Sequence, residues 1–184
     1  MVEKVDPLSM ALLVLAMLLG SGGSAVFNHL YDRDIDAVMK RTRNRPLVVG
    51  SISNTDALML SAGLTIAGLS TAVMTLNWVV AAHLFLGIFV YAIVYTVWLK
   101  RRTWWNIVFG GAAGSFALLA GAALGEPAQW LLPTLLAITL FLWTPSHFWA
   151  LAILLADDYR AAGVPMLPVV VGEKRTSLWI LANS

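Results

Sequence analysis

Three polar side chains, spaced four residues apart, lie at the end of the first apolar stretch of this sequence. They are Asn28, Asp32 and Asp36. Positions i, i+4 and i+8 of a helix share one face, so an amide oxygen and two carboxylates would point in one direction, with Asp34 directed elsewhere. Carboxylates this close repel each other unless a cation lies among them, and hard oxygen ligands favour Mg²⁺. The spacing therefore predicts a magnesium site.

A strongly basic segment follows this motif directly. It carries four cations within six residues, Lys40, Arg41, Arg43 and Arg45. Guanidinium groups match the geometry of phosphate oxygens, so the combination is typical of a site for a metal ion and a diphosphate. The alternative is that the carboxylates only pair with neighbouring Arg residues, while the basic loop sets the topology and contacts lipid headgroups.

The elements that must position these residues are membrane helices. Of the 184 residues, 59% are hydrophobic and only 12% are charged, about half the charged share of a typical soluble domain. This excludes a soluble enzyme and a disordered segment, and the net charge of +2 lacks the basic excess of a nucleic-acid-binding module. The absence of cysteine excludes disulfides and thiolate chemistry.

Five apolar stretches are long enough to cross a bilayer, which takes about 20 helical residues. We expect spans over 8–27, 57–76, 78–99, 106–124 and 130–156, and a partial span over 177–184. Nearly all basic residues lie in the loops after the first, third and fifth spans. By the positive-inside rule these loops are cytoplasmic.

This topology puts the amino terminus outside, and the sixth span is unfinished. Both features indicate a piece of a longer protein, incomplete at both ends; the alternative is a genuinely short chain whose terminus lies outside. A second acidic pair, Asp157 and Asp158, falls on the same membrane face as the first motif. Two acidic clusters on one face would hold metal ions from opposite sides of a diphosphate, which eases the departure of pyrophosphate from an allylic carbon.

Four stretches of the chain resemble the intramembrane aromatic prenyltransferase superfamily and, within it, the group that farnesylates protohaem IX. The polar motif matches the pattern Asn-x-x-x-Asp-x-x-x-Asp of that superfamily. The stretches are 28–36 with 41–47, 106–114, 143–151 and 158–168. Three features depart from these patterns. Leu154 replaces the first of two Asp residues that the superfamily often carries four apart. Residues 115–118 lack the Pro-Pro that the group tends to carry after the Gly-Ala-rich stretch, and Ser146 replaces the second Pro of its Pro-Pro-His sequence.

The resemblance implies an all-α polytopic membrane bundle of nine helices, of which 1–184 would be a single incomplete domain with five complete spans. It implies transfer of a farnesyl group from farnesyl diphosphate to a vinyl group of haem B, with Mg²⁺, to give haem O. It further implies a multi-pass protein of the cell membrane with its active-site loops on the cytoplasmic side. Haem-copper oxidase assembly proteins are implied partners, and nucleic acid is not. Rival interpretations are prenyl transfer to a quinone precursor or a chlorin, and a non-catalytic haem-binding membrane protein.

Each candidate residue has a role under this interpretation, and no residue need act as a nucleophile. The expected metal ligands are Asn28, Asp32, Asp36, Asp157 and Asp158, and the expected substrate-binding residues are Lys40, Arg41, Arg43, Arg45, Asn106, His147 and Lys174. Three of these assignments have open alternatives. Asn106 would bind diphosphate or cap a helix, His147 would contact the porphyrin or a neighbouring helix, and Lys174 would cover the diphosphate or only set the topology.

Other polar and small residues favour structural roles. We expect His83, inside the third span, to make an interhelical hydrogen bond, and the run Gly110–Gly114 to let helices pack closely. Lys100, Arg101 and Arg102, beside two tryptophans, are interpreted as basic anchors at the membrane interface.

Overall fold

The computed structural model describes residues 6–125 and 130–183, which are helical and contain no strand. The expectations for the first five residues, for the outer loop over 126–129 and for Ser184 lie outside the described residues. The elements are α1 (Pro7–Tyr31), α2 (Arg33–Val38), α3 (Asn54–Thr75), α4 (Trp78–Phe89), the π-helix η1 (Val90–Leu99), α5 (Asn106–Gly110), α6 (Ala112–Ala122), α7 (Leu131–Leu154), α8 (Ala156–Ala161), α9 (Leu167–Val171) and α10 (Glu173–Asn183).

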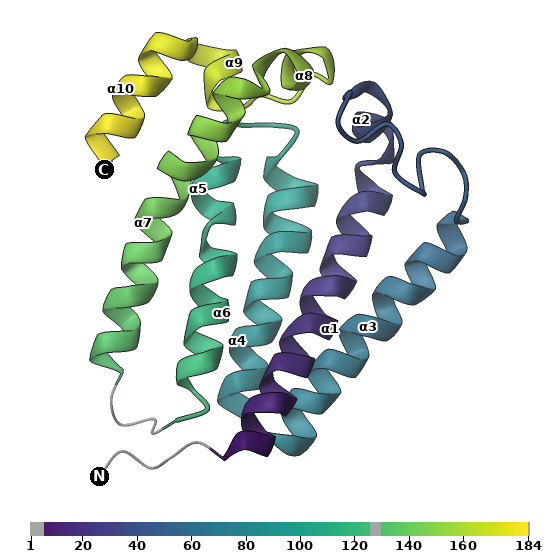
Figure 1. Cartoon of the computed structure of the whole chain (residues 1–184), viewed down its shortest axis with the longest axis vertical. Coiled ribbons are helices and arrows are strands. Elements are labelled where there is room, and N and C mark those ends of the chain that lie inside the picture. Colours follow the sequence, from purple (N-terminus) through teal and green to yellow (C-terminus); the bar gives the residue numbers. More distant parts are fainter. Residues whose placement is uncertain (1–5, 126–129, 184) are drawn as a thin grey trace.

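Within residues 6–125 and 130–183, four helical segments are long and apolar enough to cross a membrane, so the chain is an integral membrane protein. They are Pro7–Tyr31, Asn54–Thr75, Trp78–Leu99 and Leu131–Leu154. Four of the five predicted spans fall on these segments. The stretch predicted over 106–124 is instead made of α5 and α6, which adjoin at Gly111, and Figure 1 shows them in line beside α4. The partial span predicted from residue 177 begins inside α10.

Three of the four long apolar segments, those that start with α1, α3 and α4, begin where a side chain satisfies a free backbone N–H group. The carboxylate of Asp6 accepts a hydrogen bond from the N–H of Ser9, and Pro7 occupies the first turn. The side chains of Ser53 and Asn77 cap α3 and α4 in the same way. Such caps define where each helix starts, because the first four N–H groups of a helix have no partner within it.

Neighbouring helices pack through small residues. α1 packs against α3, α4 against α6, and α7 against α6 and α10. A Cβ atom added at Gly68 of α3 would lie 2.8 Å from the backbone nitrogen of Gly20 in α1, so these backbones are in direct contact. In the predicted glycine run, a Cβ at Gly110 would lie 2.9 Å from the Tyr95 ring, and one at Gly111 3.0 Å from Thr144. The expectation that this run permits close packing is confirmed.

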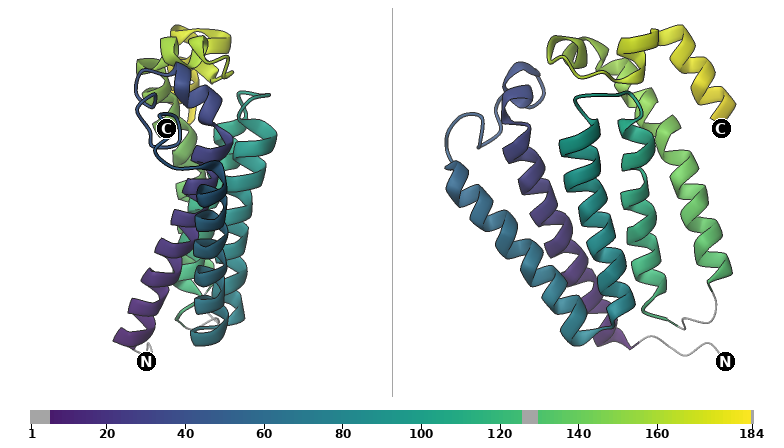
Figure 2. Two further views of the ribbon diagram at one scale, coloured as in Figure 1. Left: turned by 90° about the vertical axis from the view of Figure 1, so that its right-hand side faces the viewer. Right: turned by 180° about the vertical axis from the view of Figure 1, so that it is seen from behind.

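The charged loops meet at one end of the bundle. Figure 1 shows α2, α8 and α9 at the same end as the loop between η1 and α5, while α1 and α7 begin at the other end. The two further views in Figure 2 show the same arrangement, with the long helices side by side in a narrow layer. The acidic motif and the basic segments therefore share one end of the molecule.

Candidate functional site

The site is built on the end of α1, where three polar side chains are buried. Asp32 ends α1 and starts α2, and its side chain has 0% exposure. Asn28 and Asp36 are buried as well, and the Asn28 amide donates a hydrogen bond to Asp32 Oδ2 over 2.8 Å. Asp34 lies on the outer side of the chain, as its place in the spacing predicts.

Two cations from the end of η1 contact the buried carboxylate. Lys100 Nζ pairs with Asp32 Oδ2, and Arg101 approaches Asp32 Oδ1 at 3.4 Å. Arg101 also forms two 2.7 Å hydrogen bonds with the carboxylate of Asp34. Sequence reasoning assigned both cations to membrane anchoring and missed these contacts. The available signal was that their loop lies on the membrane face of the acidic motif, and a buried carboxylate needs a partner.

Thr96 of η1 orients the amide of Asn28. The Thr96 hydroxyl donates a hydrogen bond to the backbone oxygen of Tyr91 over 2.8 Å and accepts one from Asn28 Nδ2 over 3.1 Å. Both N–H groups of the Asn28 amide are thus used, one on Thr96 and one on Asp32. No described residue donates a hydrogen bond to Asn28 Oδ1, so this oxygen is available as a ligand.

The basic segment after the motif contacts it through one residue. Arg45 pairs with Asp36 Oδ2 at 2.5 Å, and the buried Thr42 hydroxyl donates a hydrogen bond to the Asp36 backbone oxygen. The other three predicted cations are exposed, and the described part of the chain offers them no ion-pair partner within 4.0 Å; they are Lys40, Arg41 and Arg43.

Within the described ranges, no hydrogen bond or ion pair links the second acidic pair to the first. The Asp157 side chain is 96% exposed and pairs with Arg160 one turn along α8, at 2.5 Å. Asp158 is half-buried. Among the described residues, no three His, Asp or Glu side chains lie close enough together to hold a metal ion. The structure thus does not join the two acidic pairs around a common point.

The remaining predicted site residues have separate environments. Asn106 is fully buried, and its amide donates a hydrogen bond to the backbone oxygen of Lys100 over 3.3 Å, so it supports the loop that carries this cation. His147 is exposed on α7, where its ring stacks on Trp143 at 4.5 Å. Lys174 is exposed near the start of α10. Neither His147 nor Lys174 joins the buried carboxylate group.

Electrostatic coupling in the loops keeps the outer ion pair charged. The hydrogen bonds from Arg101 lower the pKa of Asp34, and the same bonds raise the pKa of Arg101. On α8, burial raises the pKa of the Tyr159 hydroxyl. The ion pair between Arg101 and Asp34 is therefore charged at neutral pH.

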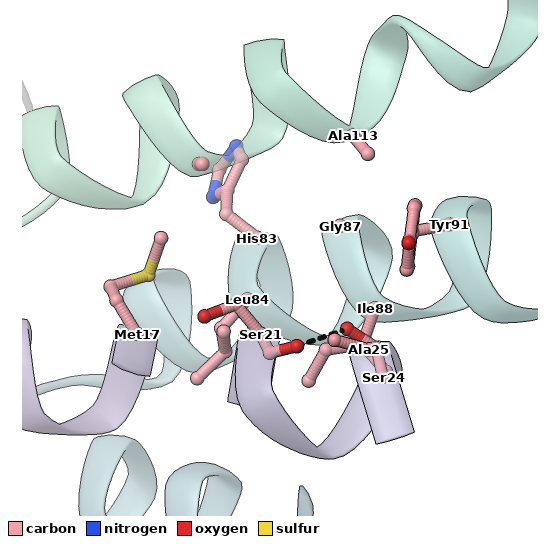
Figure 3. Close-up of a pocket in the computed structure, with 11 residues that line it drawn as sticks. Met17, Ser21, Ser24, Ala25, His83, Leu84, Gly87, Ile88, Tyr91 and Ala113 are labelled. Atoms are coloured by element: carbon pink, nitrogen blue, oxygen red, sulfur yellow. Dashed lines mark hydrogen bonds between the residues drawn. The ribbon is translucent and has the colours of Figure 1, made fainter. Parts of the chain in front are cut away.

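A largely apolar cavity of about 230 Å³ lies between α1, α4, η1 and α6. Figure 3 shows Tyr91 toward one end of the cavity, and Met17 and His83 toward the other. The Tyr91 end is nearest the carboxylates, because the Tyr91 backbone oxygen accepts a hydrogen bond from Thr96, which also contacts Asn28. The expectation of an interhelical hydrogen bond for His83 is wrong, because its Nδ1 lies 2.8 Å from the backbone oxygen of Val79 in its own helix. This bond leaves the ring facing the cavity. The acidic and basic side chains thus lie beyond one end of an apolar chamber.

Comparison with known proteins finds one family and relatives that share one name. The model of the UbiA prenyltransferase family matches residues 2–183. Protoheme IX farnesyltransferase 1 of Paramagnetospirillum magneticum is 64% identical over 181 residues, which cover 98% of this chain and 64% of that protein. Protoheme IX farnesyltransferase of Pyrobaculum islandicum is 45% identical over 174 residues, covering 95% and 63%. The chain thus spans less than two thirds of the length of these relatives.

Solved structures establish the fold. A UbiA homolog from Archaeoglobus fulgidus bound to DMAPP and Mg2+ matches with a TM-score of 0.84 and 20% identity, covering 98% of this chain and 64% of that one. The same homolog bound to GPP and Mg2+ matches with a TM-score of 0.84 and 21% identity.

Proposed function

Because this chain belongs to the UbiA prenyltransferase family, we propose that it transfers a farnesyl group from farnesyl diphosphate to a vinyl group of protohaem IX (haem B), giving haem O. The names of the relatives support this donor and acceptor. The observation that carries the proposal is the cluster of buried carboxylates and cations beyond one end of an apolar cavity. A prenyl diphosphate has the same two parts, a charged head and an apolar chain.

The diphosphate replaces Asp32 as the partner of two cations. The carboxylate is fully buried, whereas the side chains of Lys100 and Arg101 are 13% and 32% exposed. The cations can therefore be reached while the carboxylate behind them cannot. Phosphate oxygens accept charge-assisted hydrogen bonds from ammonium and guanidinium groups, so diphosphate binding draws both cations from Asp32 and frees its oxygens.

The oxygens so released suit a magnesium ion. Asn28 Oδ1 and the carboxylates of Asp32 and Asp36 are hard donors on consecutive turns. Mg²⁺ usually takes one or two carboxylates together with substrate phosphates, which fits a group of few protein ligands. When bound, Mg²⁺ supplies positive charge that neutralises the departing diphosphate.

The chain's own residues then assist the break of the allylic C–O bond. The bonding electrons go to the diphosphate oxygen, and Lys100, Arg101 and Arg45 stabilise the charge that develops there. The allylic cation stays in the apolar cavity, away from water, until the outer vinyl carbon of the acceptor attacks it. The positive charge then lies on the inner vinyl carbon, where one water molecule adds and loses a proton to give the hydroxyl group of haem O. Tyr91 lines the cavity where this cation forms.

The other predicted residues extend this site in our proposal. The second acidic group, Asp157 and Asp158, would add metal ligands, and Asn106 holds the Lys100 loop in place. Further diphosphate contacts are proposed for Lys40, Arg41, Arg43 and Lys174, and an acceptor contact for His147. By the positive-inside rule we propose that this end of the bundle faces the cytoplasm from the cell membrane, and that haem-copper oxidase assembly proteins receive the product.

The test is a mass-spectrometric assay for farnesylated haem. Membranes that contain the protein are incubated with haem B, farnesyl diphosphate and Mg²⁺. We expect a farnesyl adduct that disappears with EDTA and in Asp32→Asn. The adduct should persist in Arg102→Ala, because among the described residues this side chain bonds only the Trp98 backbone oxygen. Prenylation of a quinone precursor without any haem adduct would contradict the proposal that haem B is the acceptor. Haem binding indifferent to Mg²⁺ and to Asp32, without any adduct, would contradict the reaction.

A further inference from the structure

On the basis of the proposed function, which assigns the cavity to the prenyl chain, we propose that Met17 and His83 form its floor. This floor limits the prenyl chain of the substrate to three isoprene units. Met17 and His83 lie on α1 and α4, which both run from the far end of the bundle toward the end that holds the carboxylates. They are thus specificity-determining residues for the prenyl donor.

The order of the lining residues gives the cavity a direction. Figure 3 shows Met17 and His83 toward one end, and Ala25 and Tyr91 toward the other. The second end adjoins the carboxylate group, because Asn28 follows Ala25 by one helical turn on α1. A diphosphate held at Asn28 therefore points its prenyl chain along the cavity toward His83.

The depth of the cavity matches one chain length. Met17 and Ala25 are eight residues apart, as are His83 and Tyr91, which at about 1.5 Å per helical residue corresponds to about 12 Å. An extended carbon chain advances about 1.2 Å per bond, so a geranyl chain reaches about 8 Å, a farnesyl chain about 13 Å and a geranylgeranyl chain about 18 Å. The farnesyl chain fills the cavity, and a fourth isoprene unit would pass the floor.

The imidazole is held rigidly at this position. Its Nδ1 lies 2.8 Å from the Val79 backbone oxygen, and its ring stacks on Trp130 with centroids 5.7 Å apart. The Phe116 ring lies on another side, at 6.3 Å. A longer prenyl chain would have to displace these contacts and bring apolar carbon against a polar ring. The floor therefore resists penetration, which a flexible side chain alone would not do.

One turn above the floor, Gly87 keeps the cavity open. A Cβ atom added there would lie 3.4 Å from the Ala113 backbone oxygen and 3.7 Å from the Cβ of Phe116, so the backbone tolerates a side chain. The rest of a larger side chain must then enter the space between α4 and α6, which the cavity occupies. A leucine at this position would raise the floor by about 6 Å, one turn of helix.

The experiment measures binding selectivity on the full chain in lipid nanodiscs with Mg²⁺. Dimethylallyl, geranyl, farnesyl and geranylgeranyl diphosphates are titrated, with dissociation constants from isothermal titration calorimetry. Wild type is expected to bind farnesyl diphosphate at least tenfold more tightly than either geranyl or geranylgeranyl diphosphate. His83→Ala and, independently, Met17→Ala should tighten geranylgeranyl binding at least tenfold without changing dimethylallyl binding. Gly87→Leu should weaken farnesyl binding at least tenfold and spare the dimethylallyl compound.

The control is Phe85→Ala, a neighbouring residue of α4 that is 51% exposed and does not line the cavity; its selectivity should equal that of wild type. Wild-type selectivity in both floor variants would overturn the floor while leaving the diphosphate site intact. Unchanged farnesyl binding in Gly87→Leu would do the same. If wild type binds none of the four compounds, the proposed function fails and the floor fails with it.

Discussion

Replacing Lys100 by methionine tests how the buried carboxylate is held. The substitution keeps most of the side-chain volume and removes the charge that pairs with Asp32. Asp32 has no exposed surface, so water cannot replace the lost partner. Breaking a buried ion pair by removing one partner costs about 3 to 5 kcal/mol. Arg101 remains near the other oxygen, at 3.4 Å, which favours the lower end, about 3 kcal/mol.

The assay is thermal unfolding of the purified protein in detergent, combined with farnesyl diphosphate titration. For a chain of this size, 1 kcal/mol shifts the melting temperature by about 2 to 4 °C, so Lys100→Met should lower it by about 6 to 12 °C. Farnesyl diphosphate binding should weaken at least tenfold. Arg102→Met is the matched control, because in the described part of the chain the only hydrogen bond of that side chain is to a backbone oxygen. It should leave both quantities unchanged.

The double variant Lys100→Met/Asp32→Asn separates the charge from the packing. Neutralising the carboxylate removes the unpaired charge, so the double variant should regain most of the lost stability while diphosphate binding stays weak. If Lys100→Met melts like wild type, or if the double variant is no more stable than the single one, the ion pair does not hold Asp32 and the partner exchange proposed for diphosphate binding is refuted.

Three further predictions concern the surroundings of this site. Thr96→Val removes the hydroxyl that accepts a hydrogen bond from Asn28, at a net cost of about 1 kcal/mol. The Mg²⁺ concentration for half-maximal farnesyl diphosphate binding should therefore rise about fivefold, and Thr96→Ser should restore the wild-type value. Equal values in the two variants would contradict the role of Thr96 in orienting Asn28. The pKa of Asp34 is lowered in the folded state, so its ion pair with Arg101 stabilises the fold at pH values above the unfolded pKa of 3.8. This stability is lost as the pH falls through the folded pKa. The difference in melting temperature between wild type and Asp34→Asn should therefore be present at pH 7 and vanish in acid, and a pH-independent difference would oppose this. Gly68→Ala would place a Cβ atom 2.8 Å from a backbone nitrogen of α1, whereas the Cβ atom of Gly63→Ala would meet nothing within 4 Å. Gly68→Ala should lower the melting temperature, because overpacking costs about 1 to 3 kcal/mol. Equal melting temperatures for Gly68→Ala and Gly63→Ala would disprove the close contact between α1 and α3.

The sequence by itself was sufficient for the features that depend on local composition and spacing. Apolar length predicted four spans that the structure contains. The four-residue spacing singled out Asn28, Asp32 and Asp36 as one group, and the structure buries all three side chains where α1 meets α2. The distribution of Lys and Arg predicted that the charged loops share one end of the bundle. Each of these properties follows from helix geometry or from the cost of burying charge in hydrocarbon.

Only the tertiary structure decided which residues meet across the chain. Asn28 contacts Thr96, and Asp32 contacts Lys100, because α1 packs against η1 and the π-helix turns both side chains toward α1. The wider turn of a π-helix has no signal in the periodicity of the residues, so spacing could not predict it. The same packing leaves Asp157 exposed on α8 and forms a half-open cavity that His83 lines. Pairing and enclosed space depend on the relative rotation of helices, and that is set by contacts between segments far apart in the sequence.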